Sequence, residues 1–227
     1  MEAAAVVCAA GASVRMGGIK KEYQKLNSCL TVLESSVRAF ASVPSIEVIV
    51  IAICAGTEDA ARAALSPETL SAQMPKIQFV NGGESRRASV FNALSLLSQY
   101  NPCYVLIHDG ARPWVTVNLI KSALESVKKY GAVIPLLPLM DTPKECDTSL
   151  CEQEVFIKRH LKRVNTGAAQ TPQAFKFPEI LYVHQKAAEV KDEEFTDDAE
   201  IWGRFCGQVA VIPGEPENRK ITFQGDI

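Results

Sequence analysis

The sequence lacks the features by which nucleic-acid-binding and membrane proteins are recognised. Its 227 residues carry a formal net charge of −2, so no overall basic charge would attract a nucleic acid. No apolar run approaches the length of a membrane span, and the N-terminal residues lack the positively charged leader of a signal peptide. We therefore expect a cytoplasmic protein that has neither a nucleic acid nor a membrane as partner, and in which any phosphate binding is local.

Residues that hold structural metals or form disulfides are few or scattered. The seven cysteines lie at positions 8, 29, 54, 103, 146, 151 and 206, without a C-x-x-C pair. Reduced thiols in a cytoplasm are the simplest account of this pattern. The histidines, His108, His160 and His184, are far apart in the sequence, which gives a structural zinc site little support. Any metal ion is expected to arrive with a substrate.

What the sequence does contain is a regular alternation of strand-like and helix-like segments. A hydrophobic share of 47% with 22% charged residues is ordinary for a folded globular protein. Expected strands cover 4–9, 46–53, 77–80, 104–107, 132–137 and 209–212, and expected helices cover 31–41, 59–65, 87–97, 115–129, 177–189 and 197–205. This order predicts a single α/β domain over 1–227 with a doubly wound, mostly parallel, Rossmann-like sheet.

The alternation breaks between Pro138 and Arg163. This segment contains prolines at 138 and 143, acidic residues, two cysteines and one strand-like stretch at 154–157. It is too long for an ordinary connection between elements, and such segments are usually functional arms or flexible excursions. We expect a protruding β-arm at about 138–163.

The loop after the first expected strand combines small residues with cations. The strand ends in Ala9, Ala10 and Gly11, and the loop adds Arg15, Lys20, Lys21 and Lys25. Small residues let backbone N–H groups approach phosphate oxygens, and the cations neutralise them. The glycine spacing matches neither the dinucleotide fingerprint nor the P-loop, which argues against a nicotinamide oxidoreductase. The pattern predicts a loop that binds a nucleotide triphosphate.

Two further polar loops are expected at the same edge of the sheet, because ligands of doubly wound sheets bind beyond the carboxyl ends of the strands. Gly82 and Gly83 permit close backbone approach to a flat base, and Ser89 lies in the first turns of the next helix. Asp109, at the tip of another strand, is placed to hold Mg²⁺ or to orient a hydroxyl. Arg112 could instead pair with Asp109 structurally, and we interpret His108 as a core or supporting residue.

Seven segments of the chain, in this order, resemble the 2-C-methyl-D-erythritol 4-phosphate cytidylyltransferase family. They are 9–16 (A-A-G followed by R-M), 82–90 (G-G-E-S-R-R-A-S-V), 108–113 (H-D-G-A-R-P), 141–142 (D-T), 170–175 (Q-T-P-Q-A-F), 196–199 (T-D-D-A) and 218–222 (N-R-K-I-T). The resemblance spans nearly the whole chain. It implies a nucleotidyltransferase fold and an enzyme that makes a CDP-polyol and pyrophosphate from CTP and a polyol phosphate, with Mg²⁺.

The resemblance also implies roles for individual residues. Arg15 and Lys21 would act on the triphosphate and on the pentacoordinate transition state. Lys20 is an adjacent rival for the second role, because the loop is one residue shorter than the family form and lacks its proline before the lysine. Tyr23 favours Lys21. Arg163 and Lys220 would position the attacking phosphate, which completes a catalytic set of four cations.

The remaining implied contacts are of two kinds. Polyol-phosphate contacts are Asp109, Arg112, Thr142, Thr196, Arg163 and Lys220. Nucleotide contacts are Ala9, Ala10, Gly11, Gly83, Glu84, Ser89, Asp109 and Gly110, with Asp109 also a weak metal ligand beside an Mg²⁺ carried mainly by the CTP phosphates. Glu84 stands where Asp is more usual in the family, and Gly110 stands where Ala is, so the detailed shape of the pocket is open.

Alternatives to this interpretation remain at the level of the sequence. A ribitol 5-phosphate cytidylyltransferase would share the fold and the first loop, and a non-catalytic nucleotide-binding regulator could use the same scaffold. The regulator would have no need of cations for two substrates, whereas the sequence has them. The family packs its arm against a mate in a homodimer, so the resemblance implies a homodimer with shared active sites.

Overall fold

The structure is a computed structural model that describes residues 1–11, 17–18, 20–26, 29–73, 75–150, 152–190 and 195–226. Within these residues eight strands form one sheet in the order β10-β5-β9-β4-β1-β2-β3, with β8 beside β5. Their bounds are β1 Ala3–Ala9, β2 Ile46–Ile53, β3 Lys76–Asn81, β4 Tyr104–Asp109, β5 Ala132–Pro138, β8 Gly167–Ala169, β9 Gln173–Lys176 and β10 Ala210–Pro213. The expected doubly wound α/β sheet is confirmed.

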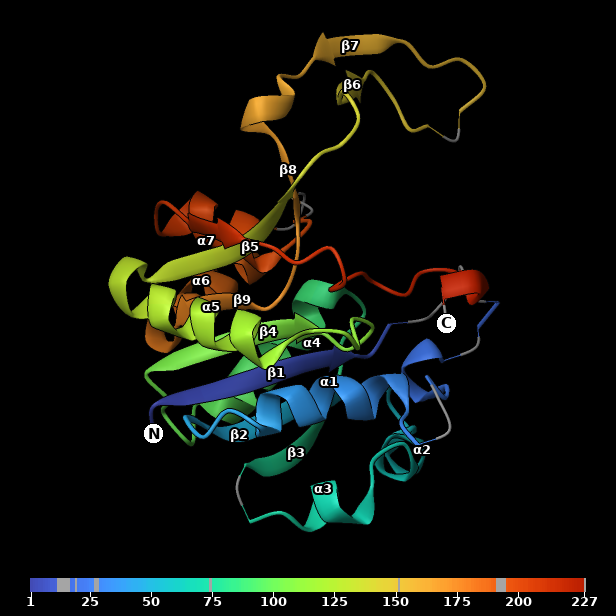
Figure 1. Ribbon diagram of the computed structural model, residues 1–227. Coiled ribbons are helices and arrows are strands. Elements are labelled where there is room, and N and C mark those ends of the chain that lie inside the picture. The colour runs from blue at the N-terminus through green and yellow to red at the C-terminus, as the bar shows by residue number, and fades with distance from the viewer. Residues whose placement is uncertain are drawn as a thin grey trace.

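Helices cover both faces of this sheet (Figure 1). Their bounds are α1 Val32–Ala41, α2 Glu58–Ala63, α3 Pro67–Ser71, α4 Arg86–Leu97, α5 Val117–Tyr130, α6 Phe177–Glu189 and α7 Asp198–Phe205. Five helix starts are capped by side chains that accept hydrogen bonds from N–H groups of the first turn, those of Thr31, Ser66, Ser85, Thr116 and Asp197. Among the described residues, no helix combines the length and the apolar character needed to cross a membrane.

Strand β1 lies at the centre of the sheet and is apolar at every position. Ala5 and Val7 pack in one core layer with α1 and α5, whereas Ala4 and Val6 pack in the other with α4, α6 and α7. A central strand covered by helices on both faces buries both sets of alternating side chains, which explains its continuous apolar run. β1 pairs in parallel with β2 and with β4, so the ends of these strands lie at one edge.

The sheet is mixed because β9 runs antiparallel between β4 and β5. The sequence pattern did not predict β9 as a strand: it is four residues long and directly follows Pro172, so it has no alternating run of its own. Ala174 and Phe175 are nevertheless fully buried, because neighbours cover them on both faces of the sheet. The remaining major pairs, β1 with β2, β1 with β4, β2 with β3 and β5 with β10, are parallel.

The segment after β5 leaves the sheet as an arm, seen at the top of Figure 1. The arm contains β6, Lys144–Cys146, and β7, Ile157–His160, which pair antiparallel. The strand expected at 154–157 is therefore shifted to 157–160. The shift follows from pairing, since Lys144 lies opposite His160, and Lys158 and Arg159 both form ion pairs with Glu145.

Candidate active site

A cavity of about 520 Å³ opens at the carboxyl ends of β1, β2, β3 and β4, beside the start of α4. Eight of the residues expected to bind nucleotide or substrate line it: Ala10, Gly11, Lys21, Gly83, Glu84, Ser89, Asp109 and Lys220. They come from four separate parts of the sequence, so the sheet topology is what brings them together. The expected edge for ligand binding is thus where the structure has its cavity.

The other expected site residues lie around this cavity or away from it. Ala9 is buried at the end of β1, and Gly110 follows Asp109, with its N–H donating to the carbonyl oxygen of Cys8. Thr196 bonds through its N–H and its hydroxyl to the carboxylate of Glu200. Thr142 and Arg163 belong to the arm, and Arg15 lies outside the described residues.

Asp109 is the charged centre of the site. Its Oδ2 lies 2.9 Å from Nζ of Lys220 and 3.6 Å from Nε of Arg112, and its Oδ1 lies 3.4 Å from Nε of Arg86. Burial alone would raise the pKa of Asp109, but the nearby cations, Lys220 foremost, outweigh burial and hold that pKa far below its ordinary value. The carboxylate is therefore ionised at any physiological pH. The pairing of Arg112 with Asp109 that the sequence analysis gave as the structural alternative is present.

Arg86 is a site residue that the sequence analysis missed. It begins α4 and lines the cavity, and its guanidinium lies between Asp109 and Asp198, with 2.7 Å from Nη2 to the Asp198 carboxylate. The expected motif 82–90 contains Arg86, but a basic residue at a helix start reads equally well as solvated surface. Only the folded structure shows its two acidic partners, Asp109 at the end of β4 and Asp198 at the start of α7.

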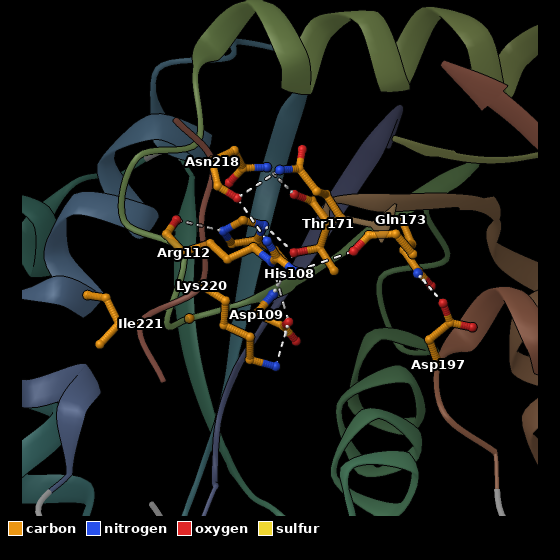
Figure 2. Close-up of polar contacts among 12 residues, drawn as sticks. His108, Asp109, Arg112, Thr171, Gln173, Asp197, Asn218, Lys220 and Ile221 are labelled. Carbon is orange, nitrogen blue, oxygen red and sulfur yellow. Dashed lines mark hydrogen bonds and ion pairs between the residues drawn. The ribbon is translucent and has the colours of Figure 1, made fainter. Parts of the chain in front are cut away.

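Lys220 is directed into the cavity by a strongly bonded C-terminal segment (Figure 2). The buried Asn218 donates from Nδ2 to the carbonyl oxygen of Thr171 over 2.8 Å, and its own carbonyl accepts from Nη1 of Arg112. On the other side of Lys220, the N–H of Ile221 donates to the carbonyl of Ala111. These bonds fix the backbone on both sides of Lys220, so its ammonium meets Asp109.

The two adjacent lysines of the first loop reach different places. Nζ of Lys20 contacts the carbonyl of Gly11 at 2.9 Å and Sγ of Cys54 at 2.8 Å. Nζ of Lys21 donates to the carbonyl of Ile221 at 2.8 Å, next to Lys220. The next residue, Glu22, is 3% exposed and lines the cavity, and burial raises the pKa of its carboxyl. Both lysines line the cavity, so the structure by itself allows either to meet a phosphate.

The Gly82–Gly83 turn is closed against the start of α4. The N–H of Gly82 donates to the carbonyl of Ile53, and the N–H of Gly83 donates to the Ser89 hydroxyl over 3.1 Å. A methyl group on Gly82 would lie 2.4 Å from Cβ of Ala10, and one on Gly83 would lie 2.5 Å from Cβ of Ala88. Neither position has room for a side chain, because the turn packs closely against Ala10 and Ala88. The close approach of this turn to a base stays a prediction.

His108 is a buried supporting residue, as the sequence indicates. Its Nδ1 lies 2.9 Å from the Thr171 hydroxyl and its Nε2 lies 3.2 Å from the carbonyl of Arg112. The Thr171 hydroxyl accepts from the N–H of Asp109, so its proton is available for Nδ1. A neutral ring protonated at Nε2 satisfies every one of these contacts. Burial, the main cause, lowers the pKa of His108 to about 4.

The arm presents exposed apolar side chains and two of the expected substrate contacts. Phe156 is 66% exposed, Leu150 is 79% exposed and Val164 is 90% exposed. Arg163 donates from Nη1 to the carbonyl of Met140, and neither Arg163 nor Thr142 lines the cavity of its own chain. Large apolar side chains exposed along one projecting segment suit an interaction surface.

The acidic residues of the site do not form a metal-binding cluster. Both oxygens of Asp109 already face cations, and no group of three or more His, Cys, Asp or Glu side chains gathers for a metal among the described residues. This donor set does not fit a dedicated ion held by protein ligands alone. It is compatible with a divalent ion that enters on the phosphates of a nucleotide.

Comparison with known proteins gives one consistent family. The family model described as "IspD: 2-C-methyl-D-erythritol 4-phosphate cytidylyltransferase" matches residues 3–227. A bifunctional enzyme IspD/IspF of Brucella anthropi is 36% identical over 227 residues, which cover 99% of this chain and 53% of that protein. A second bifunctional enzyme IspD/IspF, from a Bradyrhizobium strain, is 37% identical over 226 residues, which cover 98% of this chain and 54% of that protein. The chain spans about half the length of the curated relatives it matches.

Solved structures give the same result for the fold. The 4-diphosphocytidyl-2C-methyl-D-erythritol synthase of Anaerococcus prevotii matches with a TM-score of 0.82 at 27% identity, covering 99% of this chain and 92% of that one. The 2-C-methyl-D-erythritol 4-phosphate cytidylyltransferase of Thermus thermophilus matches with a TM-score of 0.76 at 28% identity, covering 100% and 95%.

Proposed function

We propose that this chain, which belongs to the 2-C-methyl-D-erythritol 4-phosphate cytidylyltransferase (IspD) family, transfers the cytidylyl group of CTP to 2-C-methyl-D-erythritol 4-phosphate. The products are 4-diphosphocytidyl-2-C-methyl-D-erythritol and pyrophosphate, a step of non-mevalonate isoprenoid synthesis in the cytoplasm. The observation that carries the proposal is the cavity. A lysine and two arginines from three distant segments, Lys220, Arg86 and Arg112, surround the ionised carboxylate of Asp109, and Lys20 and Lys21 also line the cavity, beside a glycine turn without room for a side chain.

The reaction needs positioning more than proton transfer. A phosphate oxygen of the polyol phosphate attacks the α-phosphorus of CTP, the bond from that phosphorus to the oxygen bridging to the β-phosphorus breaks, and pyrophosphate leaves with that oxygen. The nucleophile is already an anion, so no general base is required. Holding two polyanions in line can supply about 7 to 11 kcal/mol of the barrier reduction. Cations that face the developing charge stabilise the transition state further.

We assign the cations of this chain to the two substrates. Lys21, with Arg15, would contact the triphosphate and the transition state, and Lys220, with Arg163, would hold the attacking phosphate. Asp109 supports this division, because it holds Lys220 at 2.9 Å and keeps the ammonium within the cavity. Asp109, Arg112 and Thr196 would contact the polyol phosphate.

The base is proposed to bind at the Gly82–Gly83 turn. Gly83, Glu84 and Ser89 line one wall of the cavity together with Ala10 and Gly11, and Asp109 with Gly110 would meet the ribose. Backbone groups that hydrogen-bond one base edge are left unpaired when another base occupies the site. CTP should therefore be preferred strongly over ATP, GTP and UTP.

Magnesium is proposed to enter as the companion of CTP, where it neutralises part of the triphosphate charge. The ion pairs on both oxygens of Asp109 support this form over a resident ion. Any contribution of Asp109 to the metal would be weak.

We further propose that two copies of the chain form a homodimer with shared active sites. The support is the arm: its apolar side chains are exposed, and its expected substrate contacts, Thr142 and Arg163, do not line the cavity of their own chain. In a two-fold symmetric pair each arm would cover its apolar surface on the mate and bring these residues to the neighbouring cavity.

An assay of pyrophosphate release tests the activity. The purified chain is incubated with Mg²⁺, each of the four nucleoside triphosphates, and either 2-C-methyl-D-erythritol 4-phosphate or ribitol 5-phosphate, and the product is identified by mass spectrometry. Rapid release with CTP and methylerythritol phosphate alone is expected. Turnover of ribitol 5-phosphate at a comparable rate would reassign the substrate, and comparable turnover with ATP or GTP would contradict the proposed base site.

A further inference from the structure

A line of four charged or titratable side chains runs from the cavity into the core between α6 and α7. It consists of Asp109, Arg86, Asp198 and His184, and we call it the Arg86 network. Nε of Arg86 lies 3.4 Å from the Asp109 carboxylate and Nη2 lies 2.7 Å from the Asp198 carboxylate. The other oxygen of Asp198 lies 3.2 Å from Nε2 of His184.

We propose that Asp198 is a positioning residue for the cavity: acting through Arg86, it fixes the carboxylate of Asp109 against Lys220. The inference deepens the proposed function and rests on it, because the site concerned is the one assigned to the polyol phosphate and the ribose. Asp198 itself does not line the cavity.

The burial of Asp198 is the first step of the argument. Asp198 and His184 are both completely buried, whereas the Arg86 side chain is 29% exposed and reaches from them to the cavity wall. A buried carboxylate is retained at great cost unless a cation pairs with it. The guanidinium of Arg86 is therefore tied firmly at its Nη2 end, by a contact 0.7 Å shorter than the one it makes to Asp109.

The second step is that the two carboxylate oxygens of Asp109 face different cations. Arg86 approaches Oδ1, while Lys220 and Arg112 approach Oδ2. Without the Asp198 charge, the guanidinium would be free to move onto Asp109 or onto an incoming phosphate, and Asp109 would no longer be held for Lys220. Arginine suits the task because its rigid fork meets two carboxylates at once, which a lysine ammonium on a flexible stem does less well.

The third step is the attachment of the start of α7 to strand β9. Asp198 is the first residue of α7, and the capping residue before it, Asp197, accepts from Nε2 of Gln173 on β9 over 2.8 Å. The N–H of Ala199 donates in turn to Oε1 of Gln173. The start of α7 is thus fixed to the central sheet, so it provides a rigid support for Arg86.

The test is Asp198→Asn, which removes the charge and keeps the shape. Its matched control is Glu34→Gln on α1. Glu34 is 2% exposed and pairs with Arg38, as Asp198 pairs with Arg86, but Arg38 does not line the cavity, whereas Arg86 does. We expect Asp198→Asn to lower kcat/KM by about 10- to 100-fold, as misplaced site groups do, and to weaken CTP binding measured by calorimetry. Glu34→Gln should leave kcat/KM and CTP binding unchanged, even if its melting temperature falls as much as that of Asp198→Asn.

A double-mutant cycle decides whether Asp198 acts through Arg86. Arg86→Lys, at a partly exposed side chain, should fold and should itself lower kcat/KM by about 10-fold or more. In that background Asp198→Asn should cost less than about 2-fold more, because the link is already broken. If Asp198→Asn lowered kcat/KM by the same factor in the wild type and in Arg86→Lys, the proposal would be overturned. Full activity of Arg86→Lys would also overturn it, and this variant can be measured even if Asp198→Asn does not fold.

The same experiments separate the network from the proposed function. If the wild-type chain released no pyrophosphate with any polyol phosphate, the proposed function would fail, and the cycle would be measured on CTP affinity instead. Suppose instead that the wild type is fully active, and that Asp198→Asn and Arg86→Lys bind CTP as tightly as the wild type does. That result would count against the Arg86 network and not against the proposed function.

Discussion

The ammonium of Lys21 donates a hydrogen bond to the carbonyl oxygen of Ile221, with 2.8 Å between the two atoms. This contact fastens the loop expected to bind the triphosphate to the segment that carries Lys220, the cation expected to hold the second substrate. The cations assigned to the two polyanions are therefore neighbours across one cavity. In-line transfer requires such a geometry, and it makes the role of Lys21 testable against Lys20.

Lys21→Ala should lower kcat by about 100- to 1,000-fold, because loss of a preorganised cation facing the transition state has that effect. Lys20→Ala should remain active within a small factor, since the Lys20 ammonium is held by Gly11 and Cys54 and not beside the segment that carries Lys220. Steady-state turnover of both variants with saturating CTP is the measurement. A more severe loss in Lys20→Ala than in Lys21→Ala would reverse the assignment.

Gly82→Ala should weaken CTP binding by about 10-fold or more. Its methyl group would lie 2.4 Å from Cβ of Ala10 and 2.7 Å from the Ser89 hydroxyl oxygen. Overpacking of this kind costs about 1 to 3 kcal/mol, here at the wall proposed to read the base. Gly203→Ala on α7 is the control, because nothing lies within 4 Å of its added methyl group. Calorimetric titration with CTP that finds both variants equal to wild type would contradict the proposed base site.

Mixing two inactive variants should restore activity if active sites are shared. Lys21→Ala damages the cavity of its own chain, and Arg163→Ala damages the arm that would serve the partner's cavity. Random re-pairing then gives mixed dimers, each with one intact site. Pyrophosphate release after mixing is the measurement.

The mixing experiment needs proof that subunits exchange. Two affinity tags on the two variants, followed by sequential capture, would isolate the mixed dimer. Confirmed exchange without any return of activity would rule out the shared site, and so would sedimentation of the wild type as a monomer at assay concentration.

Folding stability should fall as the pH drops from about 6.5 to about 4, in part because of His108. Burial lowers the pKa of His108 to about 4, below the ordinary value of about 6.5. Between these values the unfolded chain binds the proton and the folded chain does not, so stability is lost as pH falls. The histidine accounts for about 3 kcal/mol of this loss, since one pKa unit corresponds to about 1.4 kcal/mol.

Urea unfolding of wild type and His108→Gln at pH 7 and pH 4 measures how much His108 contributes to this loss of folding stability. The variant should be less stable at pH 7, because it loses the contacts to Thr171 and Arg112, and it should lose less stability on acidification. His160→Gln on the arm, where the side chain is exposed, is the control and should behave as wild type. The same pH dependence in all three proteins would disprove the role of His108.

Much of the fold followed from local pattern. The continuous apolar run of β1 and the amphipathic helices α1 and α5 have periods that belong to one kind of element, and their bounds matched to within two residues. β9 could not be predicted in this way, because four residues after a proline are too few to show a strand pattern. They form a strand because they pair with β4 on one side and with β5 on the other. The arm strand was misplaced for a similar reason: cross-strand pairing with Lys144–Cys146, which no local pattern reveals, selects 157–160.

The sequence by itself determined the sheet edge, the glycine turn and most of the cavity, because loops that follow parallel strands must meet at one edge, and glycine pairs and cations carry their chemistry in any context. Tertiary structure alone decided the partners of each charge. Whether Arg86 is solvated or held between Asp109 and Asp198 depends on where α7 meets α4, and whether Lys220 meets Asp109 depends on how Asn218 anchors its segment to Thr171. These contacts join residues distant in sequence, and their energies depend on burial, a property of the folded chain.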